Sequence, residues 1–389
     1  MTAIHLDGLR LSGEKLDESD LDEAAIEAAL LDFEAQERER LGLPATDVAK
    51  DPYVENIARG FTKAQRGETT ILAGGLTMAH DRFVAGALAG IGYKMQPLDV
   101  PDTDALRFGK EFGNRGQCNP TYFTVGNLVK ALSYMRDVEG IPTEEIIERY
   151  LFLTAGACGP CRFGTYVTEY RKALRDAGFD GFRVMLFQQQ GGLKQATGDE
   201  TGLELSHEFF VKIITAIVAG DVINLLGYRM RPYEVEEGAV DRGLERCKDL
   251  LHDALLNQTS ILKAMWGVRR EMSKVALDRT RVKPKVAIIG EFWAMTTEGD
   301  GNYKMQAFLQ GEGAEVDTQI VTAWIIFMIW ENIRDTQHRE TLREDDTARK
   351  GLAGKNPWKK VIQLKIAERA IRGIFQGFAN LMGVHGYKL

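Results

Sequence analysis

Two cysteines three residues apart carry the clearest chemical signal in the sequence. Cys158 and Cys161 enclose Gly159-Pro160, at the point where an apolar run gives way to glycine and a helical pattern begins. A turn that enters a helix offers free N–H groups and the positive end of the helix dipole, and both stabilise a thiolate. Because a thiolate binds soft metals and is also a redox nucleophile, the motif is compatible with a metal or iron–sulfur site and with a thioredoxin-type dithiol.

A third cysteine favours the metal site. Cys118 lies between Gly116 and Pro120, which indicates a loop. This loop ends one predicted strand–helix unit, and the motif with Cys158 and Cys161 ends the next. Because the carboxyl ends of parallel strands converge on one crevice, the two loops can meet. We therefore predict that Cys118, Cys158 and Cys161 are the thiolate ligands of one site.

The fourth cysteine has two interpretations. Cys247 lies in 243–251, an apparent amphipathic helix, so it is either a core cysteine or a fourth ligand, and no spacing rule decides between them. A closed zinc site would need a fourth ligand, and the sequence has neither a second CxxC motif nor an HxxxH pair. Iron–sulfur clusters accept thiolates from widely separated turns. The cysteine pattern therefore favours a cluster over zinc.

A dithiol oxidoreductase is the alternative for the same motif. A thioredoxin domain carries its dithiol near its beginning, beside a cis-proline loop. Here Cys158 and Cys161 lie mid-chain in a larger α/β pattern, and the strand expected at 183–187 continues into glutamines and glycines without a proline. The dithiol is therefore the less favoured alternative.

Motifs for phosphate binding and for a serine nucleophile are missing from the sequence. It contains no GxxxxGK[ST], no GxGxxG after a strand and no GxSxG. If the reaction uses ATP, another chain must bind it.

The composition is that of an ordinary soluble globular protein, with 44% hydrophobic and 27% charged residues. A net charge of −7 without a long lysine/arginine run argues against a nucleic-acid partner. Four cysteines do not make a disulfide framework. The N-terminus lacks a signal-peptide pattern, and the most apolar stretch, 321–330, is about half as long as a membrane span. We expect a cytoplasmic protein with no membrane span.

Alternating strand and helix patterns predict the α/β class with parallel sheets. We expect a helical N-terminal arm at 1–68, an α/β lobe at 69–235 with Cys118 and the CGPC motif, and a second α/β lobe with a helical C-terminal tail at 236–389. The expected strands are 69–75, 93–98, 149–154, 183–187, 285–289 and 315–320. The expected helices are 20–41, 80–90, 124–136, 163–177, 206–220, 238–277, 302–311 and a tail from 321 to about 382 with a polar break near 345–357.

Three groups of residues resemble a known family. They are Gly116-Gln117-Cys118-Asn119-Pro120 with 126–132, then Gly159-Pro160-Cys161-Arg162-Phe163-Gly164, then 283–291 ending in Gly290-Glu291 and followed by Asn302 and 311–316. With these groups in this order, the chain from about 69 to 320 resembles the family of 2-hydroxyacyl-CoA dehydratase subunits, benzoyl-CoA reductase subunits and double-cubane cluster proteins. It is most similar to the branch of acyl-CoA dehydratase activase-related proteins.

The resemblance implies two Rossmann-like lobes around an interlobe cleft that holds an oxygen-sensitive iron–sulfur cluster. Cys118, Cys158 and Cys161 match ligand positions of the family, and Glu291 matches a strand end that faces the cleft. The family's low-potential electrons come from a separate ATP-hydrolysing activase. Because one chain's four cysteines are too few for a double-cubane cluster, a larger cluster would have to be shared between chains of a homo- or hetero-oligomer.

These observations lead to one main hypothesis and two alternatives. The main hypothesis is an iron–sulfur subunit with a [4Fe–4S] cluster, in an ATP-dependent low-potential reductase or dehydratase system with an activase or a homologous subunit as partner. The first alternative is a non-catalytic cluster-bearing scaffold or electron relay, for which the acidic N-terminal arm and the aromatic residues Trp324, Phe327 and Trp330 are candidate docking elements. The second is the dithiol oxidoreductase.

Overall fold

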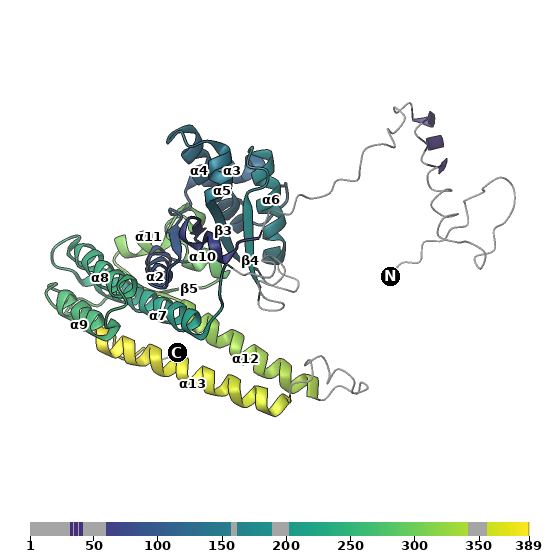
Figure 1. Ribbon diagram of the computed structural model, residues 1–389. Helices are drawn as coiled ribbons and strands as arrows, with labels where there is room; N and C mark the ends of the chain where they lie inside the picture. Colours follow the sequence, from purple (N-terminus) through teal and green to yellow (C-terminus); the bar gives the residue numbers. More distant parts are fainter. Residues whose placement is uncertain are drawn as a thin grey trace. The chain divides into compact units, whose positions relative to one another are not determined.

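The computed structural model describes residues 32–33, 35–37, 39–41, 60–156, 162–188, 202–340, 356–387 and 389 (Figure 1). The chain divides into two compact units, Met1–Asn56 and Ile57–Leu389. The described residues of the first unit are helical except Leu41. The second unit contains both sheets and the long helices.

Helices make up most of the second unit. Those of the first half are α2 (Met78–Ala89), α3 (Thr103–Phe112), α4 (Asn119–Asp137), α5 (Thr143–Arg149), α6 (Tyr166–Asp176) and α7 (His207–Met230). Those of the second half are α8 (Ala239–Leu256), α9 (Ile261–Met272), α10 (Phe292–Thr296), α11 (Met305–Gly311), α12 (Val321–Glu340) and α13 (Pro357–Met382). Short 3-10 turns add η1 (Lys63–Gly67), η2 (Arg162–Thr165), η4 (Arg231–Tyr233) and η5 (Asp300–Asn302).

A four-stranded parallel sheet confirms the predicted α/β class. Its strands are β1 (Thr70–Ala73), β2 (Lys94–Pro97), β3 (Tyr150–Gly156) and β4 (Arg183–Gln188). The order is β2-β1-β3-β4, so the chain leaves β1 on one side for β2 and returns to β3 on the other side. In open parallel sheets, ligands bind outside the carboxyl ends of the strands where the order reverses in this way. Here that place lies between the ends of β1 and β3.

Helices cover both faces of this sheet. Successive strand residues point to opposite faces, and a parallel sheet is normally buried on both. Leu72 and Phe152 pack in one core with α4 and α6. Ile71 and Leu151 pack in another core with α2 and α7. The sheet thus fixes the position of α4 relative to α6, the two helices that frame the candidate site.

A second, two-stranded parallel sheet pairs β5 (Lys285–Ile288) with β6 (Glu315–Thr318). The segment between these strands lies against the first turns of α3 and α4. The Trp293 ring packs on the Phe123 ring with centroids 5.6 Å apart, and the Asp300 carboxylate accepts a hydrogen bond from the Thr103 backbone N–H at 2.8 Å. The carboxyl end of β5 is therefore held near the amino end of α4.

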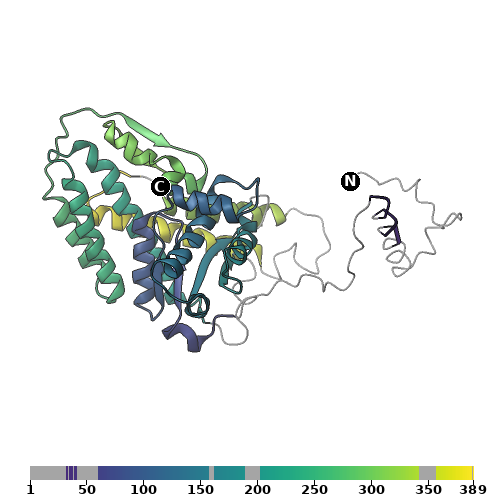
Figure 2. The ribbon, with the colours of Figure 1, turned by 90° about the horizontal axis from the view of Figure 1, so that it is seen from above.

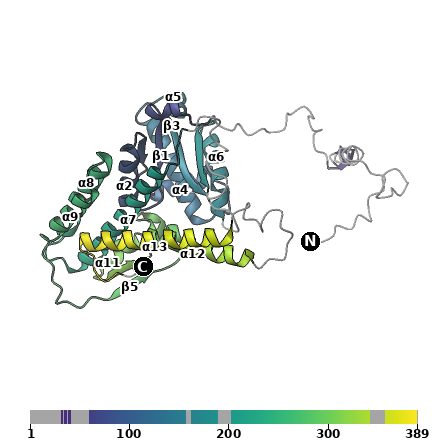
Figure 3. The same ribbon diagram turned by 60° about the horizontal axis from the view of Figure 1, so that its bottom comes forward.

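A third core consists of helices around α7, which contacts α2, α8, α12 and α13. Seen from above (Figure 2), α8 and α9 lie at one end of the unit, with α2 between them and the sheet. The helices α12 and α13 run side by side in opposite directions (Figure 3). Among the described residues, the helical stretch His207–Tyr233 is long and apolar enough to cross a membrane, but most of it is buried, as in the core helix of a soluble protein.

The sequence pattern misses three short helices. None of α3, α5 and α10 is anticipated from the sequence. α4 begins at Asn119, earlier than the expected start at 124, and α7 continues past 220. Gly109 within α3 looks like a helix breaker in the sequence. In the structure it lets α3 approach the backbone of α4 at Tyr122.

Candidate metal centre

The CGPC motif joins β3 to η2. β3 ends at Gly156 and η2 begins at Arg162, so the motif follows the carboxyl end of a central strand, where the strand order reverses. Cys158 and Cys161 themselves lie outside the described residues. The candidate site is therefore built from what surrounds this connection.

Cys118 lies at the amino end of α4 and contacts the helix that follows the motif. It is the N-cap residue of α4, and Asn119-Pro120 places a proline in the first turn, where its missing N–H costs nothing. The Cys118 Sγ atom lies 2.9 Å from the Tyr166 hydroxyl and 3.0 Å from the Thr121 hydroxyl. Tyr166 is the first residue of α6, so the structure brings Cys118 to the segment that directly follows Cys161.

The surroundings of Cys118 favour its thiolate. Burial would raise the pKa of the Cys118 thiol, but hydrogen bonds from the Thr121 and Tyr166 hydroxyls and from the Thr121 backbone N–H outweigh it, and the pKa is lowered. The thiol is half-buried. Cys118 thus fits the role of a thiolate ligand.

A buried carboxylate on α6 anchors the loop before Cys118. Glu169 is 5% exposed. Its Oε1 atom accepts hydrogen bonds from the Asn114 side chain at 2.8 Å and from the Gln117 side chain at 2.9 Å. Its Oε2 atom accepts from the Asn114 backbone N–H at 3.1 Å. Cys118 is therefore positioned by α6 through two neighbouring turns, at Tyr166 and at Glu169.

Glu291 lies between β5 of the second sheet and α10. It caps α10, with its Oε2 atom accepting from the Ala294 backbone N–H at 2.9 Å. The Asn302 side chain donates to the Ala294 and Thr297 carbonyls, both at 2.8 Å, and so holds this loop closed. Burial raises the pKa of the Tyr166 phenol, and the Cys118 hydrogen bond and the Glu291 charge raise it further. Glu291 is thus close enough to act electrostatically on the hydroxyl that touches Cys118.

The structure does not bring Cys247 to this site. Cys247 is fully buried on α8 in the helical core around α7, whereas Cys118 packs against the core of α4 and α6. Its Sγ atom lies 3.8 Å from the Val268 carbonyl oxygen of α9. Burial raises the pKa of the Cys247 thiol to about 12. These are the surroundings of a core cysteine, the first of its two interpretations.

Cys118 alone cannot hold a metal. Among the described residues, no group of three histidine, cysteine or carboxylate side chains is placed to bind one. The adjacent CGPC motif, which lies outside the described residues, holds the nearest cysteines in the sequence. Sequence reasoning missed the positioning residues Thr121, Tyr166 and Glu169. Of these three, only Thr121 could have been found from the sequence, because its hydroxyl follows Cys118 by three residues in the first turn of a helix.

Asp81 is a second buried group at the reversal point of the sheet. It lies in the first turn of α2 and accepts a hydrogen bond from the Gly75 backbone N–H at 3.3 Å. Burial raises its pKa from 3.8 to about 6, against the opposing effect of His80. The folded protein therefore binds a proton in a pH range where the unfolded chain has lost it.

Asp81→Asn is expected to stabilise the protein above about pH 6. As the pH rises from about 4 to 6, ionisation of the buried carboxyl lowers the free energy of unfolding of the wild type by up to about 3 kcal/mol. Asparagine keeps an acceptor for the loop N–H groups and has no charge to bury. The stability difference, measured by urea unfolding, should be small at about pH 4 and largest at pH 7. The exposed Asp104→Asn in α3 is the control, and a difference for Asp81→Asn that does not vary with pH would contradict the expectation.

Comparisons of the chain with protein-family models, with curated proteins and with solved structures found no match.

Proposed function

We propose that this chain is an iron–sulfur subunit in which Cys118, Cys158 and Cys161 hold a [4Fe–4S] cluster. The observation that carries the proposal is the 2.9 Å contact between the Cys118 Sγ atom and the hydroxyl of Tyr166, at the start of the helix that follows the CGPC motif. A thiolate-favouring cysteine that contacts the helix following a two-cysteine motif, near the reversal point of a parallel sheet, is suited to a cluster ligated from separate turns.

The two sheets suit the family that the sequence resembles. We take them as the cores of two lobes with parallel sheets, with the cluster in the cleft between the motif after β3 and the loop after β5. Glu291 would face the cluster from the second lobe. We give it the role of a charged group near the electron-transfer site, because it follows β5 at the sheet end that faces α4 and its charge contributes to the raised pKa of Tyr166.

The chain's own groups would set the properties of the cluster. The cluster, once bound, supplies one-electron transfer at low potential and, where an iron has no protein ligand, a Lewis acid. The hydroxyls of Thr121 and Tyr166 donate hydrogen bonds to the Cys118 sulfur and so influence its potential. Glu169 keeps the ligand loop in place. Because Cys247 lies in another core, the fourth coordination position would be open or filled from outside the chain.

The partners follow from the same proposal. An activase-type ATPase in the cytoplasm would deliver single electrons, and a homologous or identical subunit would complete a larger complex. A second candidate function is a relay or scaffold without catalysis of its own. It is favoured by the aromatic row on α12, in which Phe327 is 43% and Trp330 51% exposed, because such rings suit the docking of another protein.

The proposal is tested by anaerobic purification with iron and sulfide analysis and EPR of the reduced protein. We expect iron in the wild type and loss of most of it in Cys118→Ser, with unchanged far-UV circular dichroism. Cys247→Ala is the matched control and should keep its iron, because its thiol lies in the helical core. A wild type that is free of iron yet fully active as a thiol oxidoreductase, or equal iron in Cys118→Ser and wild type, would refute the proposal.

A further inference from the structure

A cavity of about 410 Å³ lies at the amino ends of β5 and β6, away from the candidate metal centre. The end of α7, the first residues of both strands and the segment after α13 form its wall. Its volume is within the range of small-molecule sites, about 300–1,000 Å³. The cavity is therefore large enough for a ligand of moderate size.

Cations outnumber carboxylates in the wall of this cavity. Arg229, Arg279 and Lys285 line it together with one carboxylate, Glu315. Glu315 is already paired, at 3.1 Å from the Lys285 Nζ atom, and accepts a hydrogen bond from the Tyr233 hydroxyl at 3.0 Å. Neither arginine pairs with a carboxylate among the described residues. In a chain with a net charge of −7, the cavity is thus a local positive site.

Aromatic rings hold both guanidinium groups. The Arg229 Cζ atom lies 5.2 Å from the centroid of the Tyr387 ring, and the Arg279 Cζ atom lies 5.1 Å from the centroid of the Tyr233 ring. Arg229 also donates to the His385 carbonyl at 3.3 Å, so part of its N–H edge is used. Stacking restricts each side chain while leaving N–H groups at the rim of the planar group. A guanidinium group that is held by stacking can donate two hydrogen bonds to the same phosphate.

We propose that this cavity binds a phosphorylated small molecule through Arg229 and Arg279. Two guanidinium groups without a carboxylate partner in the described part of the chain match the double negative charge of a terminal phosphoryl group better than the single charge of a carboxylate. The buried side chains of Leu226 and Met230 form an apolar part of the wall that an organic group of the ligand can contact.

The proposed phosphate site is separate from the candidate metal centre. The cavity lies at the amino end of β5, whereas Glu291 follows its carboxyl end, and a four-residue strand is about 10 Å long. Parallel sheets bind reacting substrates at their carboxyl ends. A phosphorylated molecule at the opposite end is therefore a regulatory or anchoring ligand, and the proposal does not depend on the cluster.

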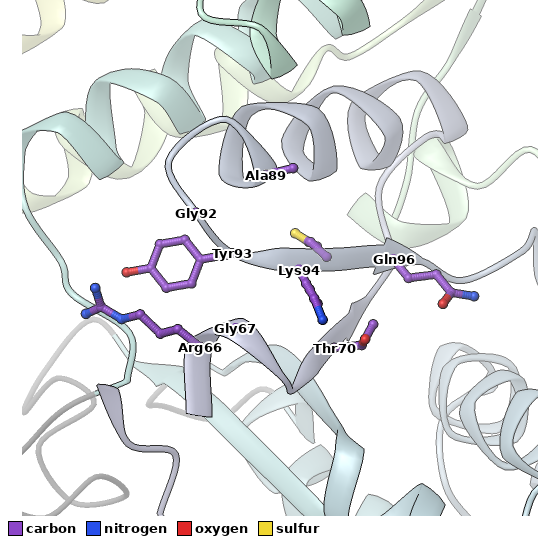
Figure 4. A pocket seen from close by; sticks show the side chains of 9 residues that line it. Arg66, Gly67, Thr70, Ala89, Gly92, Tyr93, Lys94 and Gln96 are labelled. Carbon is purple, nitrogen blue, oxygen red and sulfur yellow. The ribbon is translucent and has the colours of Figure 1, made fainter. Parts of the chain in front are cut away.

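The larger cavity of about 560 Å³ beside β2 also has an arginine stacked on an aromatic ring, because the Arg66 Cζ atom lies 5.2 Å from the centroid of the Tyr93 ring, but that arginine is paired (Figure 4). It is lined by Arg66 and Lys94. The Arg66 guanidinium is engaged by the Glu204 carboxylate at 3.2 Å and by the Gly202 carbonyl, so its charge is already compensated. We therefore place the anion site at Arg229 and Arg279.

Calorimetric titration of the anaerobically purified full chain tests the proposal. The probes are inorganic pyrophosphate and ADP, with adenosine as the uncharged control. Both phosphorylated probes are expected to bind and adenosine is not. Tighter binding of ADP would indicate a ligand with an organic group, and equal binding would indicate recognition of the phosphoryl groups alone.

Substitutions of single arginines show whether the phosphorylated probes bind in this cavity. Arg279→Ala and Arg229→Gln are expected to weaken binding about tenfold or more, because each removes a charge-assisted hydrogen bond. Arg281→Ala is the matched control: Arg281 is close in sequence, exposed and paired with Asp278 at 3.1 Å, and does not line the cavity. Arg279 is exposed, so Arg279→Ala decides even if Arg229→Gln folds poorly. Cys118→Ser should bind as the wild type does. Absence of binding of both phosphorylated probes at millimolar concentration, or an equal loss in Arg281→Ala, would overturn the proposal.

Discussion

Asp221→Ala is expected to lower the free energy of unfolding by about 4 kcal/mol or more, the largest effect of any single substitution considered for this chain. Asp221 lies on α7 and is 1% exposed. Its Oδ2 atom accepts hydrogen bonds from the Thr322 backbone N–H at 2.7 Å and from the Thr322 hydroxyl at 2.5 Å. Its Oδ1 atom accepts from the Val321 backbone N–H at 2.9 Å and lies 3.1 Å from the His80 Nε2 atom.

The size of the effect follows from the number of groups left without a partner. Val321 and Thr322 begin α12, so Asp221 satisfies N–H groups that a helix cannot satisfy within itself. His80 is also 1% exposed, and its Nδ1 atom lies 2.7 Å from the Thr77 hydroxyl at the cap of α2. Each buried donor that loses its acceptor costs about 1–3 kcal/mol. Alanine would therefore loosen the attachment of both α2 and α12 to α7.

Urea unfolding at neutral pH measures this prediction. Asp221→Asn keeps one acceptor oxygen and should lie between the wild type and Asp221→Ala. Asp253→Ala on α8 is the control, because the Asp253 side chain is 68% exposed and its loss should change the stability by less than about 1 kcal/mol. A loss below about 1 kcal/mol for Asp221→Ala would show that the network contributes little.

Gly126→Ala is expected to destabilise the protein by about 3 kcal/mol or more and to expose Cys118. A Cβ atom at Gly126 would overlap the backbone carbonyl oxygen of Ala105, and a Cβ atom at Gly109 would overlap that of Tyr122. α3 and α4 are therefore in backbone contact at both glycines. The atoms that the added methyl group would meet belong to the backbone, so no side-chain rotation relieves the overlap. The two helices must therefore move apart, which costs more than overpacking among side chains. α4 carries Cys118 at its amino end, so its displacement would disturb the contact with Tyr166.

Thermal unfolding and the rate of alkylation of Cys118 in iron-free protein measure the effect of Gly126→Ala. We expect a lower melting temperature and faster alkylation than in the wild type. Gly373→Ala is the matched control, because Gly373 also lies within a helix but has open space around its Cα atom. There, alanine should stabilise the protein by about 0.5–1 kcal/mol through its higher helix propensity. Equal effects of the two substitutions would contradict the close packing of α3 on α4.

Local patterns in the sequence predict the α/β class and most of the long elements. β-branched and apolar runs that end in glycine mark β1, β3 and β5, and the period of apolar residues marks α6, α8 and α13. These signals are local, because a strand or helix is recognised from its own residues and their immediate neighbours. Short elements such as α3 and α10 escaped recognition, because a glycine or an isolated turn outweighs the pattern of so few residues.

Which chemical groups meet depends on the packing of separate elements. The contact of Cys118 with Tyr166, the anchoring of its loop by Glu169 and the approach of Glu291 all join residues that are far apart in the sequence, so no local pattern predicts them. Cys247 had two equal interpretations on an amphipathic helix, and only the packing of α8 against α9 shows a thiol facing a buried carbonyl. The meeting of Cys118 with Cys158 and Cys161 stays a prediction. Residue types define which chemistry is available, whereas the distances that select among the possibilities arise only when separate helices and sheets pack around a common core.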